Sequence, residues 1–162
     1  MIRAMGDVRV HTNTHAERAL IAELGTHASE GTPVFTADVM MAGVIDSLSR
    51  GRIRTMRAHD FFSACQPRAR NPQAPACIEE RWRLLLPFAV KRSARFTAPA
   101  DWSRWGSEHL SYVPGLLAAA ARLGYRVTLE RTFDTAHGEA ALSLYRIDAP
   151  GVPAPGQTQA MP

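Results

Sequence analysis

The hydrophobic positions in the first half of the chain recur at helical spacing. Thr14 and Glu17 form a capping pair in front of one such segment, and each segment places its apolar side chains on one face. Helices are predicted over residues 16–29, 37–48 and 52–64, and a short edge strand over the alternating residues 8–11. The first 65 residues are therefore expected to be mostly helical.

The second half changes from helical spacing to strict alternation. Apolar helices are predicted over residues 81–91, 96–106 and 116–124, and alternating strands over residues 125–133 and 140–147. The middle helix is predicted from the cap Thr97, the first-turn residue Pro99 and the stop signal Gly106. Gly138 lies at the expected tip of a hairpin between the two strands. Three helices followed by a hairpin indicate a helix-turn-helix with a β-wing.

Two segments lack any period and mark the domain boundaries. Residues 66–76 combine three prolines with two arginines, which is typical of a linker. Residues 149–162 are rich in proline and glycine and predict a disordered tail. The expected fold is α+β, with a mostly helical N-terminal region (1–65), a Pro-rich linker (66–76), a winged helix-turn-helix (77–148) and the tail (149–162).

The second half resembles winged helix-turn-helix proteins of phages and other mobile elements. The matching pieces are Phe96 with Thr97, Gly106, Leu123 to Tyr125, Thr128 to Arg131, His137 to Glu139, and Tyr145 to Ile147. Together with the apolar helix predicted over residues 81–91, the resemblance covers about 65 residues of the chain. The resemblance implies a DNA-binding module whose hairpin serves as the wing.

Positive charge is concentrated in the middle of the chain. The 162 residues carry a formal charge of +4, but residues 50–95 hold eleven basic and three acidic side chains. Lys91 is the only lysine, so nearly all of these cations are arginines. Planar guanidinium groups bind phosphates through two hydrogen bonds at once. The charge distribution therefore favours an anionic partner.

The predicted contacts divide between phosphates and bases. Phosphate contacts are predicted for the arginines of the basic window and of the wing: Arg52, Arg54, Arg57, Arg92, Arg95, Arg104, Arg126 and Arg131. Contacts with base edges are predicted for Ser107, His109, Ser111 and Tyr112, the polar side chains near the third helix.

The leading hypothesis is a small, arginine-rich, cytoplasmic regulator of transcription that binds double-stranded DNA. Its N-terminal region would form a homodimer or recruit a host or phage protein. The alternative hypothesis is an inhibitor or adaptor that binds a protein with the same scaffold. No stretch is long and apolar enough to span a membrane, and the N-terminus does not have the pattern of a signal peptide.

Catalytic chemistry finds little support in the sequence. His15 and Glu17 have the spacing that zinc deaminases use, but Cys65 and Cys77 are separated by eleven residues rather than two. A zinc deaminase is therefore the disfavoured second alternative, and no catalytic residue, metal or cofactor is predicted. Two cysteines do not make a disulfide framework, so both are expected to be reduced thiols.

Overall fold

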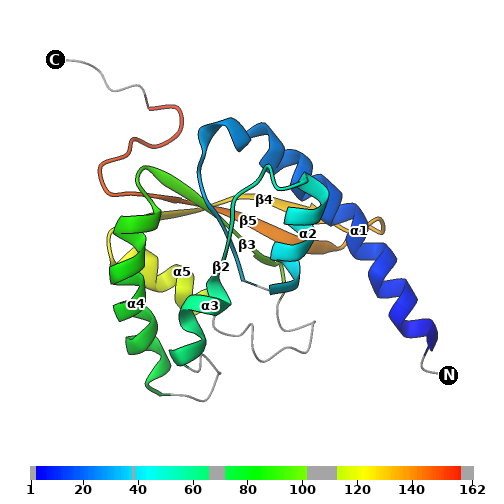
Figure 1. Ribbon diagram of the computed structural model, residues 1–162, viewed down its shortest axis with the longest axis horizontal. Helices are drawn as coiled ribbons and strands as arrows, with labels where there is room; N and C mark the ends of the chain where they lie inside the picture. The colour runs from blue at the N-terminus through cyan, green and yellow to red at the C-terminus, as the bar shows by residue number, and fades with distance from the viewer. Residues whose placement is uncertain (1–2, 38, 66–71, 102–112, 158–162) are drawn as a thin grey trace.

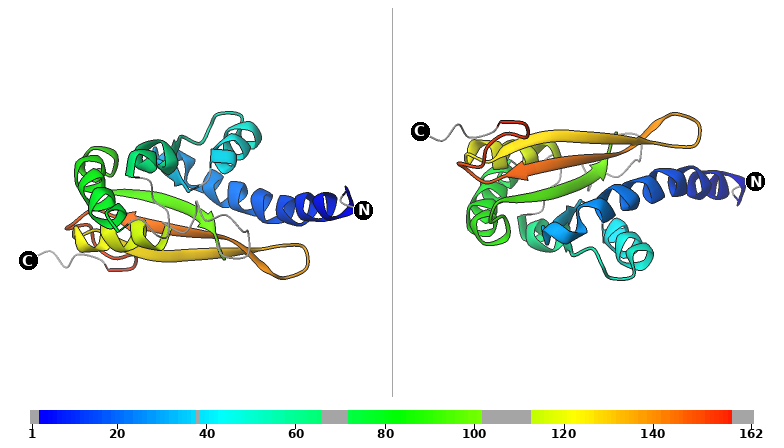
Figure 2. Two further views of the ribbon diagram at one scale, coloured as in Figure 1. Left: turned by 90° about the horizontal axis from the view of Figure 1, so that it is seen from below. Right: turned by 90° about the horizontal axis from the view of Figure 1, so that it is seen from above.

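In the computed structural model, a mixed β-sheet lies between two layers of helices (Figures 1 and 2). The structure describes residues 3–37, 39–65, 72–101 and 113–157, with side chains from residue 15 onward except at position 39. Within these residues the strands are β1 (Val34–Thr36), β2 (Thr55–Arg57), β3 (Ser93–Pro99), β4 (Arg126–Asp134) and β5 (Ala140–Asp148). Their order is β2-β1-β3-β5-β4, in which β1 is parallel to β2 and β3, whereas β5 is antiparallel to β3 and β4.

Helices cover both faces of the sheet. One layer contains α1 (Arg3–Thr26) and α2 (Val39–Ser49); the other contains α3 (Ala58–Phe62), α4 (Ala74–Ala89) and α5 (Val113–Arg122). Two short 3-10 turns, η1 (Ala28–Glu30) and η2 (Ser63–Cys65), follow α1 and α3. The predicted α+β class is confirmed. The structure also contains the helices predicted over 16–29, 37–48, 81–91 and 116–124, and the hairpin of β4 and β5. The starts predicted for two of these helices are wrong: α1 begins at Arg3 rather than behind a cap at Thr14, and α4 begins at Ala74.

Alternation along the strands separates two hydrophobic cores. On β5, Leu142 and Leu144 join the core beneath α1 and α2, whereas Ile147 joins the core beneath α3, α4 and α5. On β1, Val34 and Phe35 divide between the two cores in the same way. This division follows from the period of two in a strand, which turns successive side chains to opposite faces.

Trp82 is the centre of the larger core. Its ring makes edge-on contacts with Phe35 (5.4 Å between ring centres) and Phe62 (4.9 Å). The indole Nε1 donates a hydrogen bond to the Leu116 carbonyl at 2.8 Å. One fully buried side chain thus joins α4 to β1, α3 and α5.

The helix predicted over residues 96–106 is wrong for residues 96–99, which belong to the central strand β3. β3 pairs with β1 on one side and with β5 on the other. The capping signal at Thr97 and Pro99 was overridden because two neighbouring strands satisfy the backbone of this segment. Residues 102–106 lie outside the described part of the chain. The predicted wing strands are strands of the same sheet as β3.

The predicted division at residues 66–76 does not separate two sheets or two cores. β1 and β2 come from the N-terminal region, yet β1 pairs directly with β3 from the C-terminal region. The edge strand predicted over 8–11 is wrong, because these residues lie in α1. The helix predicted over 52–64 is only partly correct, since the segment contains β2, α3 and η2.

The beginning of the predicted tail packs against the body of the protein. The Ala149 amide donates to the Arg92 carbonyl at 2.8 Å. The Arg126 guanidinium donates to the carbonyls of Val152 (3.1 Å) and Pro153 (3.0 Å). The prediction of disorder is therefore wrong for residues 149–153, which are held by hydrogen bonds despite their proline and glycine content.

Cys65 and Cys77 form a disulfide, which corrects the prediction of two reduced thiols. The bond joins η2 to the first turns of α4 with 5.5 Å between the Cα atoms. It also removes both thiolates from the zinc hypothesis. His15 is exposed on α1, and burial raises the pKa of the Glu17 carboxyl.

None of the described helices combines the length and apolar composition needed to cross a membrane.

We predict that this disulfide stabilises the folded state by about 3 kcal/mol, because it closes a loop of 12 residues in the unfolded chain. Urea unfolding with and without reductant should show a loss of this size in the wild type. A Cys65→Ser, Cys77→Ser double variant should match the reduced wild type and should not respond to reductant. Equal stability of the oxidised and reduced wild type would contradict the prediction.

Candidate functional site

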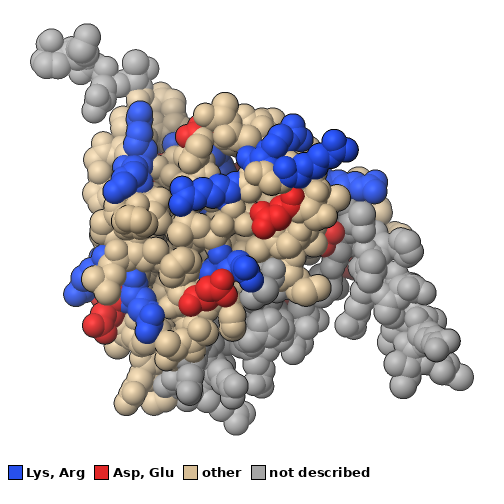
Figure 3. Space-filling view, in the orientation of Figure 1, with Lys and Arg blue, Asp and Glu red and all other residues tan. Residues whose placement is uncertain are grey.

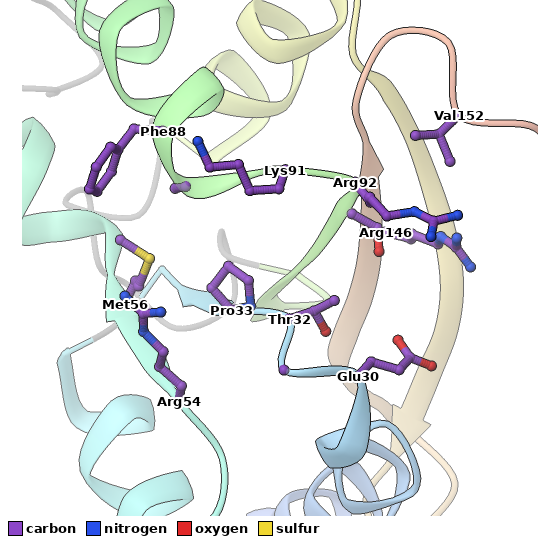
Figure 4. Close-up of a pocket in the computed structure, with 13 residues that line it drawn as sticks. Glu30, Thr32, Pro33, Arg54, Met56, Phe88, Lys91, Arg92, Arg146 and Val152 are labelled. Atoms are coloured by element: carbon purple, nitrogen blue, oxygen red, sulfur yellow. The ribbon is translucent and has the colours of Figure 1, made fainter.

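A cleft of about 710 Å³ lies at the amino ends of the three parallel strands (Figure 4). One wall is the end of α4 with the start of β3, and the other is the turn from η1 into β1 with the start of β2. Its lining residues are Glu30, Gly31, Thr32, Pro33, Arg54, Met56, Phe88, Ala89, Lys91, Arg92, Ser93, Arg146 and Val152. The volume lies in the usual range for ligand-binding pockets.

Phe88 forms the apolar end of the cleft with Met56 (Figure 4). Leu86 faces the core, and a side chain two positions later on a helix points to nearly the opposite side. Phe88 is consequently 73% exposed. The Lys91 ammonium lies 5.7 Å from the Phe88 ring centre and donates to the Pro87 carbonyl at 3.3 Å. A large aromatic side chain exposed beside a cleft offers an apolar surface to a ligand.

Arg92 and Arg146 form the opposite, cationic end (Figure 4). Arg146 is oriented by Asp148, whose Oδ1 accepts from its Nε at 2.7 Å. Asp148 is fully buried, and its other oxygen accepts from Arg126 at 2.7 Å. The terminal nitrogens of Arg146 take no part in these bonds. A rigid, buried carboxylate thus presents one guanidinium to the cleft.

The cleft has a strong excess of positive charge. Arg54, Lys91, Arg92 and Arg146 line it together with a single carboxylate, that of Glu30. Within the described residues, neither Arg54 nor Arg92 forms an ion pair. The Glu30 carboxylate is bound by a buried arginine that also binds a second carboxylate, so this group keeps one negative charge against the four cations of the cleft. Two exposed guanidinium groups without a counterion are suited to an anionic ligand.

That buried arginine is Arg95. Its burial argues against the predicted contact of Arg95 with nucleic acid. It is 2% exposed on the central strand β3. Its Nε donates to Glu130 on β4 at 3.0 Å, and its Nη1 donates to Glu30 at 3.2 Å. A buried charge must be paired, because an unpaired one loses several kcal/mol of hydration. Arg95 therefore holds the wall of the cleft in place and does not reach a ligand.

The other predicted arginines fall outside the cleft. Arg52 donates to the Ser49 carbonyl at 3.1 Å, and Arg57 is 3.5 Å from Asp60. Both are exposed: Arg52 lies on the segment that enters β2, and Arg57 is the last residue of β2. Neither residue lines the cleft.

The arginines predicted for the wing are bound within the protein. Arg131 pairs with Glu23 of α1 at 2.8 Å and lies over the Phe133 ring. Arg126 is held by Asp148 and by the carbonyls of residues 152 and 153. These contacts fasten α1 and residues 149–153 to β4. Arg104, Ser107, His109, Ser111 and Tyr112 lie outside the described residues.

Sequence analysis missed Phe88, Lys91 and Arg146 as residues of a site. Phe88 was assigned to an apolar helix as a whole, although its position relative to Trp82 and Leu86 already places it off the buried face. Lys91 was counted only in the charge of the basic window. Arg146 was hidden in the alternation of β5, because its cationic surroundings arise from distant segments of the chain.

A second polar feature lies between β1 and β3, beyond the cleft. Thr36 and Thr97 are partners in register, both fully or almost fully buried, and neither hydroxyl has a hydrogen-bond partner in the described structure. The two strands continue toward residues 38 and 102–112, which are outside the described ranges. Protein covers both hydroxyls, so they are not part of the cleft.

Comparisons of this chain with protein-family models, with curated proteins and with solved structures found no match.

We predict that Glu30 makes the folded state sensitive to acid. Hydrogen bonding to His27, together with the hydrogen bond and charge of Arg95, lowers the pKa of Glu30 below 4.5, against the opposing effect of burial. A lowered pKa stabilises the fold above pH 4.5 and ceases to do so as the pH falls through the folded-state value. Thermal unfolding of Glu30→Gln should therefore show a smaller loss of stability on acidification than the wild type.

Glu80→Gln provides the matched control for this measurement. Glu80 is exposed on α4 and forms no ion pair with any described residue. Its acid dependence should equal that of the wild type. Parallel pH profiles for the wild type and Glu30→Gln would show that the contacts of Glu30 with His27 and Arg95 contribute nothing to stability.

Proposed function

We propose that this protein binds nucleic acid at the cleft, through the phosphates of the strand. The observation that supports this most strongly is the pair Arg54 and Arg92, which line the cleft and form no ion pair with the described residues. Lys91 and Arg146 add two further cations to the same surface. Arg95 binds both Glu30 and Glu130, so this group keeps one negative charge against the four cations of the cleft, and the field in the cleft favours an anion.

The surface around the cleft extends this electrostatic attraction. Figure 3 shows Lys and Arg side chains distributed over the face seen in Figure 1, with fewer acidic side chains among them. Arg52 and Arg57 are exposed close to Arg54 in the sequence. A polyanion that follows this surface would contact several phosphates at once, and each contact releases counterions from the nucleic acid.

A protein partner is the second candidate function. Leu84 and Phe88 are one helical turn apart on α4 and are 75% and 73% exposed. Such a pair is typical of a surface that another protein covers. Salt distinguishes the two functions, because binding to phosphates weakens steeply as salt rises, whereas binding through an apolar patch changes little. Regulation of transcription and an origin in a mobile element stay predictions.

We predict that an Arg54→Ala, Arg92→Ala double variant binds nucleic acid more weakly and with a flatter salt dependence. Each phosphate contact contributes about 0.7 to 0.9 to the slope of log K against log salt, so the slope should fall by roughly one to two units. Fluorescence anisotropy with single-stranded and duplex oligonucleotides over a range of salt concentrations measures this slope. The loss of affinity should be the same for two oligonucleotides of unrelated sequence.

Arg83→Ala with Arg122→Ala removes the same charge from α4 and α5. Both arginines pair with Glu79 and do not line the cleft. The slope for this control should stay close to that of the wild type. Equal losses in the two double variants would mean that net charge alone attracts the oligonucleotide, and the proposal would then fail.

A further inference from the structure

We infer that the cleft takes one unpaired nucleotide of a single strand, with its base against Phe88 and its flanking phosphate at Arg92 and Arg146. This inference rests on the proposed function and specifies which form of nucleic acid binds. The two ends of the cleft differ in chemistry in the way that a nucleotide does (Figure 4). An aromatic and apolar end suits a base, and an end with two guanidinium groups suits a phosphate.

The aromatic end has the properties of a stacking platform. Phe88 presents a ring that is largely free of other protein side chains, being 73% exposed. Met56 lines the same end and provides a second apolar surface for the base. Stacking of one base on an aromatic side chain strengthens single-strand binding about 5- to 150-fold. Arg54 also lines the cleft, two residues before Met56 in the sequence. There it can bind a second phosphate of the same strand.

Lys91 connects the two ends. Its ammonium lies over the Phe88 ring at 5.7 Å from the ring centre and donates to Pro87, both on the exposed side of α4. A lysine head on a flexible stem exchanges such weak contacts readily. When a base stacks on the ring, the ammonium is free to turn to a phosphate. Lys91 therefore favours a ligand that carries a base and a phosphate together.

The cationic end is organised before any ligand arrives. Asp148 holds the Nε of Arg146 at 2.7 Å, and this carboxylate is itself fixed by Arg126. The terminal nitrogens of Arg146 are thereby held toward the cleft. Because the side chain is already ordered, it loses little freedom when a ligand binds, and this increases affinity. Arg92 adds a second guanidinium that forms no ion pair with the described residues.

Duplex DNA does not fit this arrangement. In a duplex the faces of the bases are covered by their neighbours, and only their edges and the phosphates are open to a protein. Phe88 can stack only on a base that has left the stack, as bases of single strands do. A cleft of about 710 Å³ has room for a nucleotide but not for a stacked and paired helix.

The test compares Phe88→Ala, Phe88→Trp and Leu84→Ala in the full chain. Leu84 is as exposed as Phe88 on the same helix but does not line the cleft. The probes are labelled oligothymidylate and oligouridylate of about twelve residues, a duplex of equal length, and free thymidine monophosphate. Anisotropy gives the affinities, and thermal unfolding confirms that the exposed substitutions leave the fold intact.

Phe88→Ala should weaken both single-stranded probes about 5- to 150-fold, with an unchanged salt slope. Phe88→Trp should retain the affinity, and Leu84→Ala should behave like the wild type. Duplex affinity should change little in all three variants. The monophosphate should bind far more weakly than the strands, because it meets only one group of cations.

Two results would overturn the inference while leaving the proposed function intact. One is unchanged single-strand affinity in Phe88→Ala, while Arg54→Ala with Arg92→Ala still weakens binding. The other is an affinity for the free monophosphate equal to that for the strands. If the wild type binds none of the oligonucleotides, the proposed function itself fails.

Discussion

The buried guanidinium of Arg95 on β3 is the interaction on which the cleft depends. It is almost fully buried, so it must be paired, and its two carboxylates come from η1 and from β4. Glu30 is thereby drawn to the amino edge of the sheet, where it places the turn into β1 as one wall of the cleft. The same contact offsets part of the charge of Glu30, because Arg95 also binds Glu130. The four cationic side chains of the cleft outweigh the one negative charge that remains.

Local sequence signals predicted an element correctly where its long-range contacts favour the same secondary structure. The β4–β5 hairpin shows clear alternation, and Gly138 at its tip adopts the positive φ of 78° that glycine favours. Thr97 and Pro99 looked like the start of a helix, yet pairing with β1 and β5 makes the segment a strand. β1 and β2 have three residues each, too few to show a period. The pairing of Cys65 with Cys77 depends on tertiary structure.

The basic window contains two arginines of the candidate cleft, but charge counting could not assign its residues. Arg54 and Arg92 lie at the cleft, whereas Arg95 is turned inward by its position on β3. Sequence does not show which arginines find a carboxylate partner, because Glu130 lies 35 residues away. The role proposed for Phe88 required a structure, since the cleft combines residues from η1 to β5 and the segment after it.

Hydrogen–deuterium exchange of the full chain with and without an oligothymidylate of about twelve residues shows whether a single strand occupies the cleft. The measurement locates bound nucleic acid on the backbone, independently of any substitution. Our account predicts slower exchange in residues 30–33 and 88–93, the two walls of the cleft, and no change at the hairpin tip, residues 135–139. Protection of the hairpin tip with an unchanged cleft would contradict it.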